Sequence, residues 1–413
     1  MPENEHPKLR NGLEALPIEH SGKQMFLLRD RTGFSGGQLV FSPDVVPVLI
    51  QMDGSNSLRD IQATYMRQSG QLIYLEQLTE LVRLLDEHLF LDNDRSRQIA
   101  AEQLAEYIDS PVRKMFHAGK SYPADPGELE DQLRSFFNTE NGGPGLPDLS
   151  HARRRKMVGL VAPHIDLSAG GPCFAHAYKA AAEADSPQTW IVLGTGHELV
   201  KNCFALTGKD FETPLGLVHC DSEICDELSR SVGRDIHVSE YNHRTEHTIE
   251  FQAVFLSFMQ PGTRIVPVLC SFGSEEWNQC RDYVDSFASR LAEIVFDQNR
   301  SVGILASIDL AHVGPRYGDP APPTAETVRS HMAMDGSLLE MLTQCRAGDF
   351  IDRVDSDGNS RKICGVAPLY TLAKALEGRA SGTILCHSYA NVDENNSFVT
   401  FAGMAFYAAE NGD

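Results

Sequence analysis

The feature that most constrains the fold is a regular alternation in the second half of the chain. Short apolar runs, each long enough for one buried strand, alternate there with longer stretches of helical periodicity. Strands that are apolar on both faces are typical of a parallel sheet covered by helices on both sides. We therefore predict a three-layer α/β/α sandwich. Its expected strands are residues 157–163, 189–193, 264–270, 302–307 and 383–386, with a closing strand at 398–408, and its expected helices are 172–184, 221–231, 246–259, 275–297, 324–345 and 364–377.

The first 98 residues have a different pattern, which indicates a small α+β domain of strands followed by three helices. This set of elements matches a winged helix, although a plain dimerisation or packing domain has the same elements. A DNA-binding winged helix is disfavoured, because the third helix carries four acidic residues and one arginine. We expect this domain at 1–98, a helical connector at 99–111 and the main domain at 112–413. The expected strands are 23–29 and 38–42, and the expected helices are 43–52, 57–70 and 75–90.

Charge and cysteine content exclude several classes of function. The chain has 57 acidic and 36 basic residues and a formal net charge of −21, so its surface repels phosphate backbones and anionic lipids. No apolar stretch is long enough to cross a bilayer, and the first residues lack the apolar segment of a signal peptide. The nine cysteines include no CxxC pair, which argues against a zinc ribbon or a secreted disulfide framework. We expect a cytoplasmic protein without nucleic-acid or membrane partners.

Three of the expected strands are followed by polar residues of the kinds that bind metals or transfer protons. The carboxyl ends of parallel strands meet at one edge of a sheet, where open α/β folds bind their ligands. A single histidine at such a place is usually structural, but three at equivalent positions favour a functional site. In chain order the residues are His164, His197, Asp309 and His312.

Two helix starts add further candidates. Glu246 and His247 open the helix expected at 246–259, where an ordinary acidic helix start is an equally good interpretation. Cys364 begins the helix expected at 364–377, and the helix dipole favours a thiolate there, either as a nucleophile or as a metal ligand. A buried structural cysteine is the alternative.

Seven motifs resemble those of the Memo family in order and spacing. They cover about residues 112–413, whereas the first 98 residues are only loosely similar to PqqD-like domains, which recognise peptides or partner proteins. The short Memo proteins lack such an N-terminal module. The motifs are FHAGKSYPADPGELEDQL (116–133), APHIDLSAGGPCFAHAYKA (162–180), LGTGHE (193–198), TPLG (213–216), EHTIEFQ (246–252), SIDLAH (307–312) and ICGVAPL (363–369).

The resemblance implies a metal site, because the Memo fold is similar to the class III extradiol dioxygenases. His164 and His197 match the two metal-binding histidines of those enzymes, and Cys364 stands where they have a glutamate ligand. Iron or copper is the implied ion, with zinc as a third candidate, since imidazole and thiolate ligands suit these metals. The change from carboxylate to thiolate supports metal binding and argues against extradiol ring cleavage itself.

The resemblance also implies catalytic residues beside the metal. His312 matches the acid/base histidine of the dioxygenases. We expect its pKa near the usual value of about 6.5 unless its surroundings perturb it, with Asp309 orienting the ring. Glu246 and His247 are the other candidate catalytic residues. The chain departs from the family where Glu198 follows the metal-binding histidine, and Glu198 either contributes to the site or points to solvent.

Three functions are consistent with these residues. The first is a metal-dependent oxidoreductase acting on a small molecule that the sequence does not identify. The second is a non-catalytic metal-binding or adaptor protein, whose N-terminal domain binds a peptide or protein partner in a pathway linked to radical-SAM enzymes. The third is a metal-independent hydrolase with Cys364 as nucleophile and His312 as base.

Overall fold

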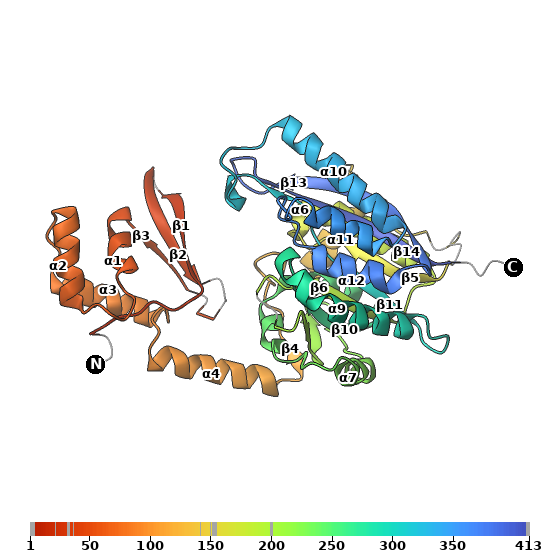
Figure 1. The fold of residues 1–413 in the computed structure, drawn as a ribbon, viewed down its shortest axis with the longest axis horizontal. Helices are drawn as coiled ribbons and strands as arrows, with labels where there is room; N and C mark the ends of the chain where they lie inside the picture. The colour runs from red at the N-terminus through yellow and green to blue at the C-terminus, as the bar shows by residue number, and fades with distance from the viewer. Residues whose placement is uncertain are drawn as a thin grey trace. The chain divides into compact units, whose positions relative to one another are not determined.

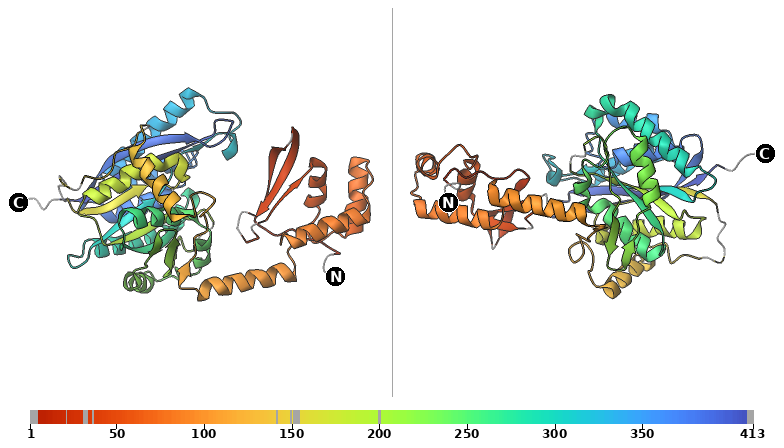
Figure 2. Two further views of the ribbon diagram at one scale, coloured as in Figure 1. Left: turned by 180° about the vertical axis from the view of Figure 1, so that it is seen from behind. Right: turned by 90° about the horizontal axis from the view of Figure 1, so that it is seen from below.

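The computed structural model describes residues 5–409, except residues 21, 31–33, 36, 141, 149, 151–154 and 199–200. The chain divides into two compact units, Met1–Asp109 and Ser110–Asp413, here called unit 1 and unit 2 (Figures 1 and 2). The division falls inside the connector expected at 99–111, and helix α4 (Asp94–Asp109) belongs to unit 1. No helix in the described part of the chain is long and apolar enough to cross a membrane.

Unit 1 contains a three-stranded antiparallel sheet. Strand β2 (Lys23–Asp30) lies between β1 (Leu13–His20) and β3 (Gln38–Phe41). The sequence pattern does not predict β1, because Glu14, Pro17 and Glu19 interrupt its apolar residues. Its position at the edge of the sheet explains how the strand tolerates a residue without an N–H group.

The helices of unit 1 share one apolar core with its sheet. The helix expected at 43–52 is instead a 3-10 turn (Pro43–Val45) followed by the short helix α1 (Val46–Ile50). Helix α2 (Leu58–Ser69) begins at a capping box formed by Ser57 and Asp60. Helix α3 (Leu75–Glu87) presents part of its leucine stripe to the core, which includes Leu28, Phe41, Ile61, Leu78, Val82, Leu85 and Phe90.

Unit 2 is built on an eight-stranded sheet. The strand order is β12-β14-β5-β11-β6-β10-β7, and β13 pairs with β14 outside this path. The central strands β5, β11, β6 and β10 are parallel, whereas the other strands pair antiparallel. The bounds are β5 (Met157–Ala162), β6 (Thr189–Thr195), β7 (Phe204–Leu206), β10 (Arg264–Cys270), β11 (Val302–Ser307), β12 (His312–Val313), β13 (Ala380–Asn391) and β14 (Phe398–Ala408).

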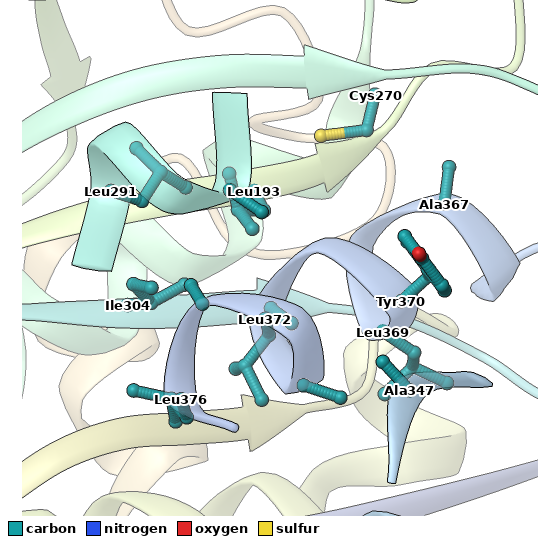
Figure 3. Close-up of a cluster of buried hydrophobic side chains, with 14 of the residues drawn as sticks. Leu193, Cys270, Leu291, Ile304, Ala347, Ala367, Leu369, Tyr370, Leu372 and Leu376 are labelled. Carbon is teal, nitrogen blue, oxygen red and sulfur yellow. The ribbon is translucent and has the colours of Figure 1, made fainter. Parts of the chain in front are cut away.

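Alternate side chains of the parallel strands point into two cores, one on each face of the sheet. Figure 3 shows Leu193 of β6 and Ile304 of β11 beside Leu372 and Leu376 of α12 in one of them. The prediction of a mixed α/β fold is therefore confirmed. One core is closed by α5 (Pro126–Asn138), α6 (Leu167–Glu183) and α8 (His247–Met259), and the other by α7 (Ser222–Ser231), α9 (Ser274–Val295), α10 (Ala325–Thr343), α11 (Ala347–Asp355) and α12 (Val366–Leu376).

Helix α6 begins five residues earlier than expected. Its N-cap is Asp166, which accepts a hydrogen bond from the backbone N–H of Ser168. Two glycines in the first turns weaken the helical pattern, but Gly171 is required by packing. A Cβ at Gly171 would lie 2.3 Å from the ring of Phe136. The glycine therefore reflects close contact between α5 and α6 and does not end the helix.

Two further elements differ from the expected ones. The helix expected at 324–345 ends as α10 at Thr343, and a second helix, α11, follows it. The strand expected at 383–386 is the middle of the twelve-residue β13. This strand pairs on one side only and is largely half-buried, so it has no long apolar run.

A separate small sheet has the order β4 (Val112–Arg113), β8 (Asp210–Thr213) and β9 (Gly216–Val218).

Candidate metal centre

The candidate site lies where three neighbouring strands of unit 2 end. Strand β11 pairs with both β5 and β6, so their carboxyl ends lie side by side, with His164 two residues beyond β5 and His197 two residues beyond β6. Cys364 comes just before α12, whose N-cap is Gly365. A Cβ at Gly365 would lie 2.8 Å from the carbonyl oxygen of Asp309, in the loop after β11. The glycine therefore lets the start of α12 pack closely against the strand ends.

His164, His197 and Cys364 form one set of potential metal ligands. Each offers one ligand atom, and the three atoms lie within 4.8 Å of one another. The Sγ of Cys364 is 3.3 Å from Nε2 of His164, and the two histidine ring centroids are 5.2 Å apart. His164 is buried, whereas 39% of the His197 side chain is exposed. The set is therefore accessible from solvent on the side of His197.

The surroundings of the three ligands shift their pKa values differently. Burial lowers the pKa of His164 well below its usual value, and the neighbouring His197 and His247 lower it further. The His164 imidazole is therefore neutral and has a lone pair to donate. Burial opposes protonation of His197 as well, but the Glu246 carboxylate and Cys364 together outweigh burial and raise the pKa of His197. Burial raises the pKa of the Cys364 thiol, and hydrogen bonding to His197 offsets this only in part.

Glu246 fixes the position of His197. It is the N-cap of α8, and its Oε1 accepts hydrogen bonds from the backbone N–H groups of His247 at 2.9 Å and Thr248 at 3.3 Å. Its Oε2 accepts a hydrogen bond from the backbone N–H of His197 at 2.9 Å, and Nδ1 of the His197 ring lies 3.2 Å from Oε1. A carboxylate in this position orients the ring of a metal-binding histidine.

His197, Glu246 and His247 form a second set of potential ligands, again within 4.8 Å of one another. The rings of His197 and His247 stack with centroids 5.0 Å apart, and Nδ1 of His247 lies 3.1 Å from Oε1 of Glu246. Glu246 and His247, expected as catalytic residues, therefore lie directly beside the first set. The side chain of Glu198 is exposed to solvent.

The Asp309 side chain is turned toward His164. Its Oδ1 accepts a hydrogen bond from the backbone N–H of His164 at 3.1 Å, and its Oδ2 lies 3.6 Å from Nε2 of the same residue. The expectation that Asp309 orients His312 is therefore wrong, since Nδ1 of His312 lies 3.0 Å from the carbonyl oxygen of Leu310 instead. Burial raises the pKa of Asp309 to about 7.

His312 belongs to neither set among the residues that the structure describes, although the charge of His197 acts on it. It begins β12, and its ring packs edge-on against Tyr317 with centroids 5.0 Å apart. Burial perturbs His312 and lowers its pKa from the usual value of about 6.5 to about 4. The imidazole is therefore neutral at pH 7 and has a lone pair available, although burial makes it a weaker base than an ordinary histidine.

A buried network beneath the start of α8 is absent from the sequence-based list of site residues. Arg113 and Glu250 form an ion pair whose two side chains are fully buried, and the hydroxyl of Tyr122 donates a hydrogen bond to Glu250. Arg113 also donates to the carbonyl oxygens of His243 and Glu246, each at 2.9 Å. The motifs at 116–133 and 246–252 contain Tyr122 and Glu250, but no local pattern connects them with Arg113. The network anchors the helix start that carries Glu246.

Comparison with known proteins finds relatives along most of the chain. The family model described as Memo-like protein matches residues 113–405. A MEMO1 family protein of Aquifex aeolicus is 26% identical over 384 residues, which are 92% of this chain and 96% of that protein. MEMO1 family proteins of Methanopyrus kandleri and Caldivirga maquilingensis are 30% and 29% identical over 273 and 301 residues. These alignments cover 65% and 72% of this chain and 88% and 99% of the two relatives. The Aquifex match extends into unit 1, because unit 2 begins only at Ser110.

Proposed function

The chain belongs to the Memo family, and on that basis we propose that it is a metal-dependent oxidoreductase with a dioxygenase-like active site. The ion is iron or copper, with zinc as a third candidate, and its ligands are His164, His197 and Cys364. One observation carries the proposal: three ligand atoms from two strand ends and a helix start lie within 4.8 Å of one another.

The residues of the site fit such an ion. Imidazole suits iron, copper and zinc, and a thiolate favours the softer of these metals. Three protein ligands leave a coordination position for a substrate, and bound iron or copper would supply one-electron chemistry there. The protein orients His197 through Glu246 and positions His164 through the backbone hydrogen bond to Asp309. His312 accepts and returns the proton of the substrate.

Metal content of the purified, untagged protein tests the ligand assignment. We expect one transition-metal ion per chain, measured by elemental analysis after anaerobic preparation. His164→Ala should lower the occupancy at least tenfold, because loss of one of three donors removes much of the affinity. The matched control is His219→Ala, a histidine with 63% of its side chain exposed. Equal metal content in both variants would refute the assignment, provided that circular dichroism shows both to be folded.

His312→Ala separates proton transfer from metal binding. The variant should keep its metal and lose reductant-driven oxygen consumption by a factor of about 100 or more, the usual contribution of a general acid or base. Loss of the metal together with the activity would make His312 a ligand. Cys364 would then be the residue that supports the ligands, and a histidine-only site would favour zinc or ferrous iron.

A second candidate function is a non-catalytic metal-binding or adaptor protein that recognises a peptide or protein partner through unit 1, in a radical-SAM-linked pathway. The observation that favours it is an apolar cavity of about 220 Å³ within unit 1. Its lining includes Leu13, Phe26 and Leu49, and Ile50 at its rim is 73% exposed. An exposed apolar side chain beside an apolar cavity is typical of a peptide-binding surface.

Selection from a random-peptide display library on the full chain tests this second function. We expect Ile50→Asp to abolish peptide capture and Leu72→Asp, another exposed apolar residue of unit 1, to leave it unchanged. Equal capture by both variants would refute a role for the cavity. Tight, salt-sensitive binding of duplex DNA by the full chain would instead favour a nucleic-acid function.

The proposal has three further parts. Unit 1 is a PqqD-like winged helix, supported by its three strands followed by helices and by its own apolar core. The main sheet and its two helical layers form the three-layer sandwich of the class III extradiol dioxygenases, supported by the core on each face. The compartment is the cytoplasm, supported by the cysteine content and the strongly acidic charge.

A further inference from the structure

Two cysteines outside the ligand sets lie side by side at the start of α7. Their Sγ atoms, on Cys220 and Cys225, are 3.2 Å apart. Both sulfurs also face the carbonyl oxygen of Thr207, at 3.9 Å and 3.8 Å. A disulfide requires about 2.05 Å between the sulfur atoms, so a movement of about 1 Å brings the two side chains to bonding distance.

The backbone on either side fixes this arrangement. The N–H group of Cys220 donates a hydrogen bond to Oδ1 of Asp210 at 2.8 Å, and Cys220 forms an isolated bridge with Ile265 of β10. The N–H group of Cys225 donates to the carbonyl oxygen of Asp221 at 3.0 Å, within the first turn of α7. The two thiols are therefore held together before any reaction, which gives them a high effective concentration toward each other.

We propose that Cys220 and Cys225 are a thiol–disulfide exchange site that reacts with low-molecular-weight disulfides of the glutathione type. Access to solvent decides which cysteine reacts first with the small disulfide, since Cys220 is half-buried and Cys225 is only 4% exposed. The hydrogen bond with Cys220 and burial both raise the pKa of the Cys225 thiol. Cys220 is therefore the attacking thiolate.

The reaction has two balanced steps. The thiolate of Cys220, having lost its proton to solvent, attacks one sulfur of the small disulfide, forms a mixed disulfide and releases one small thiol. Cys225 then loses its proton, attacks the Sγ of Cys220 and releases the second small thiol. The protein gives up two electrons and two protons, and the small disulfide is reduced to two thiols. An excess of dithiol reverses both steps.

Mass spectrometry of the full chain tests the proposal with oxidised glutathione as the probe. The protein is then unfolded in denaturant that contains N-ethylmaleimide, which blocks every remaining free thiol, and is digested with trypsin. Both cysteines lie on the single tryptic peptide that follows Lys209 and ends at Arg230. We expect this peptide to lose two hydrogen atoms, to carry no blocking group, and to regain both hydrogens after treatment with dithiothreitol.

Single variants identify the order of the steps. Cys225→Ser should accumulate the glutathione adduct on Cys220, whereas Cys220→Ser should leave Cys225 as a blocked thiol. Cys270→Ala, a change of another buried cysteine of unit 2, should leave the oxidised peptide unchanged. The proposal is overturned if both cysteines of the native protein carry the blocking group after oxidation. It is overturned equally if the glutathione adduct persists on the native chain or the disulfide forms only elsewhere, for example between Cys173 and Cys386.

Discussion

Replacing Arg113 by methionine removes the charged support beneath the start of α8. The Arg113 side chain is fully buried and pairs with Glu250. It also donates hydrogen bonds to the carbonyl oxygens of His243, Lys114 and Glu246, at 2.9 Å, 3.0 Å and 2.9 Å. Methionine keeps the apolar stem of the side chain, but it lacks the guanidinium group and offers no donor. The substitution therefore removes the charge and all of these hydrogen bonds, together with the volume of the guanidinium.

The expected loss of unfolding free energy depends on the hydrogen bonds that Glu250 keeps in the variant. Breaking a buried ion pair by removing one partner costs about 3–5 kcal/mol, because the remaining charge stays in a medium that solvates it poorly. In Arg113→Met, Glu250 still accepts hydrogen bonds from the hydroxyl of Tyr122 and from the backbone N–H groups of Phe116 and His117. These three donors reduce the penalty, so we expect unit 2 to lose about 3 kcal/mol of unfolding free energy.

Urea unfolding monitored by tryptophan fluorescence measures this loss selectively. The chain has two tryptophans, Trp190 and Trp277, and both lie in unit 2. The control is Arg329→Met, which removes the same side chain from an exposed pair with Glu326 on α10 and should cost about 0.5 kcal/mol or less. The reasoning is refuted if Arg113→Met destabilises unit 2 no more than this control does.

Three further predictions concern single residues of unit 2. Burial raises the pKa of Glu250, but the charge of Arg113, the charge of His117 and the hydrogen bonds from Tyr122 and His117 together outweigh burial and leave the pKa below the usual 4.5. The folded state then binds fewer protons at Glu250 than the unfolded state does. The stability that ionised Glu250 contributes to the folded state is therefore lost as the pH falls below about 4.5. Urea midpoints should therefore fall less steeply with acidification in Glu250→Gln than in the native chain, and equal slopes would contradict this. Asp125→Ala removes the N-cap of α5 and should lower the unfolding free energy by about 1 kcal/mol in the same fluorescence assay, where no change would exclude a capping role. Gly171→Ala places a Cβ 2.3 Å from the Phe136 ring and should cost about 1–3 kcal/mol, seen as a lower thermal midpoint, whereas Gly208→Ala, which meets nothing within 4 Å, should be neutral.

The central strands of unit 2 are predictable because burial on both faces gives them uninterrupted apolar runs. The strands expected at 264–270 and 302–307 match β10 and β11 residue for residue. The edge strands β1 and β13 lack this signal, since polar residues interrupt the apolar residues of β1 and β13 is largely half-buried. Prediction from sequence is thus best where the environment of a strand is most uniform.

The residues of the site also divide into those that a local sequence pattern predicts and those that only the folded chain brings together. His164 and His197 are found from their places after apolar runs, but the direction of the Asp309 side chain depends on a contact across 145 residues. The ion pair of Arg113 and Glu250 joins residues 137 apart. Local patterns carry no information about such pairs, and only the folded chain brings them together.

The order in which the ligands appear along the chain has a consequence for biosynthesis. The contact between Cys364 and His164 spans 200 residues, and the last strand, β14, pairs with β5, which leads to His164. A chain leaving the ribosome therefore presents both histidines long before the cysteine, and β5 lacks one of its neighbours until synthesis is nearly complete. Under the proposed ligand assignment, an ion that needs all three ligands is captured only after Cys364 has been made and has reached His164. A chain that terminates before residue 364 would then lack the third ligand.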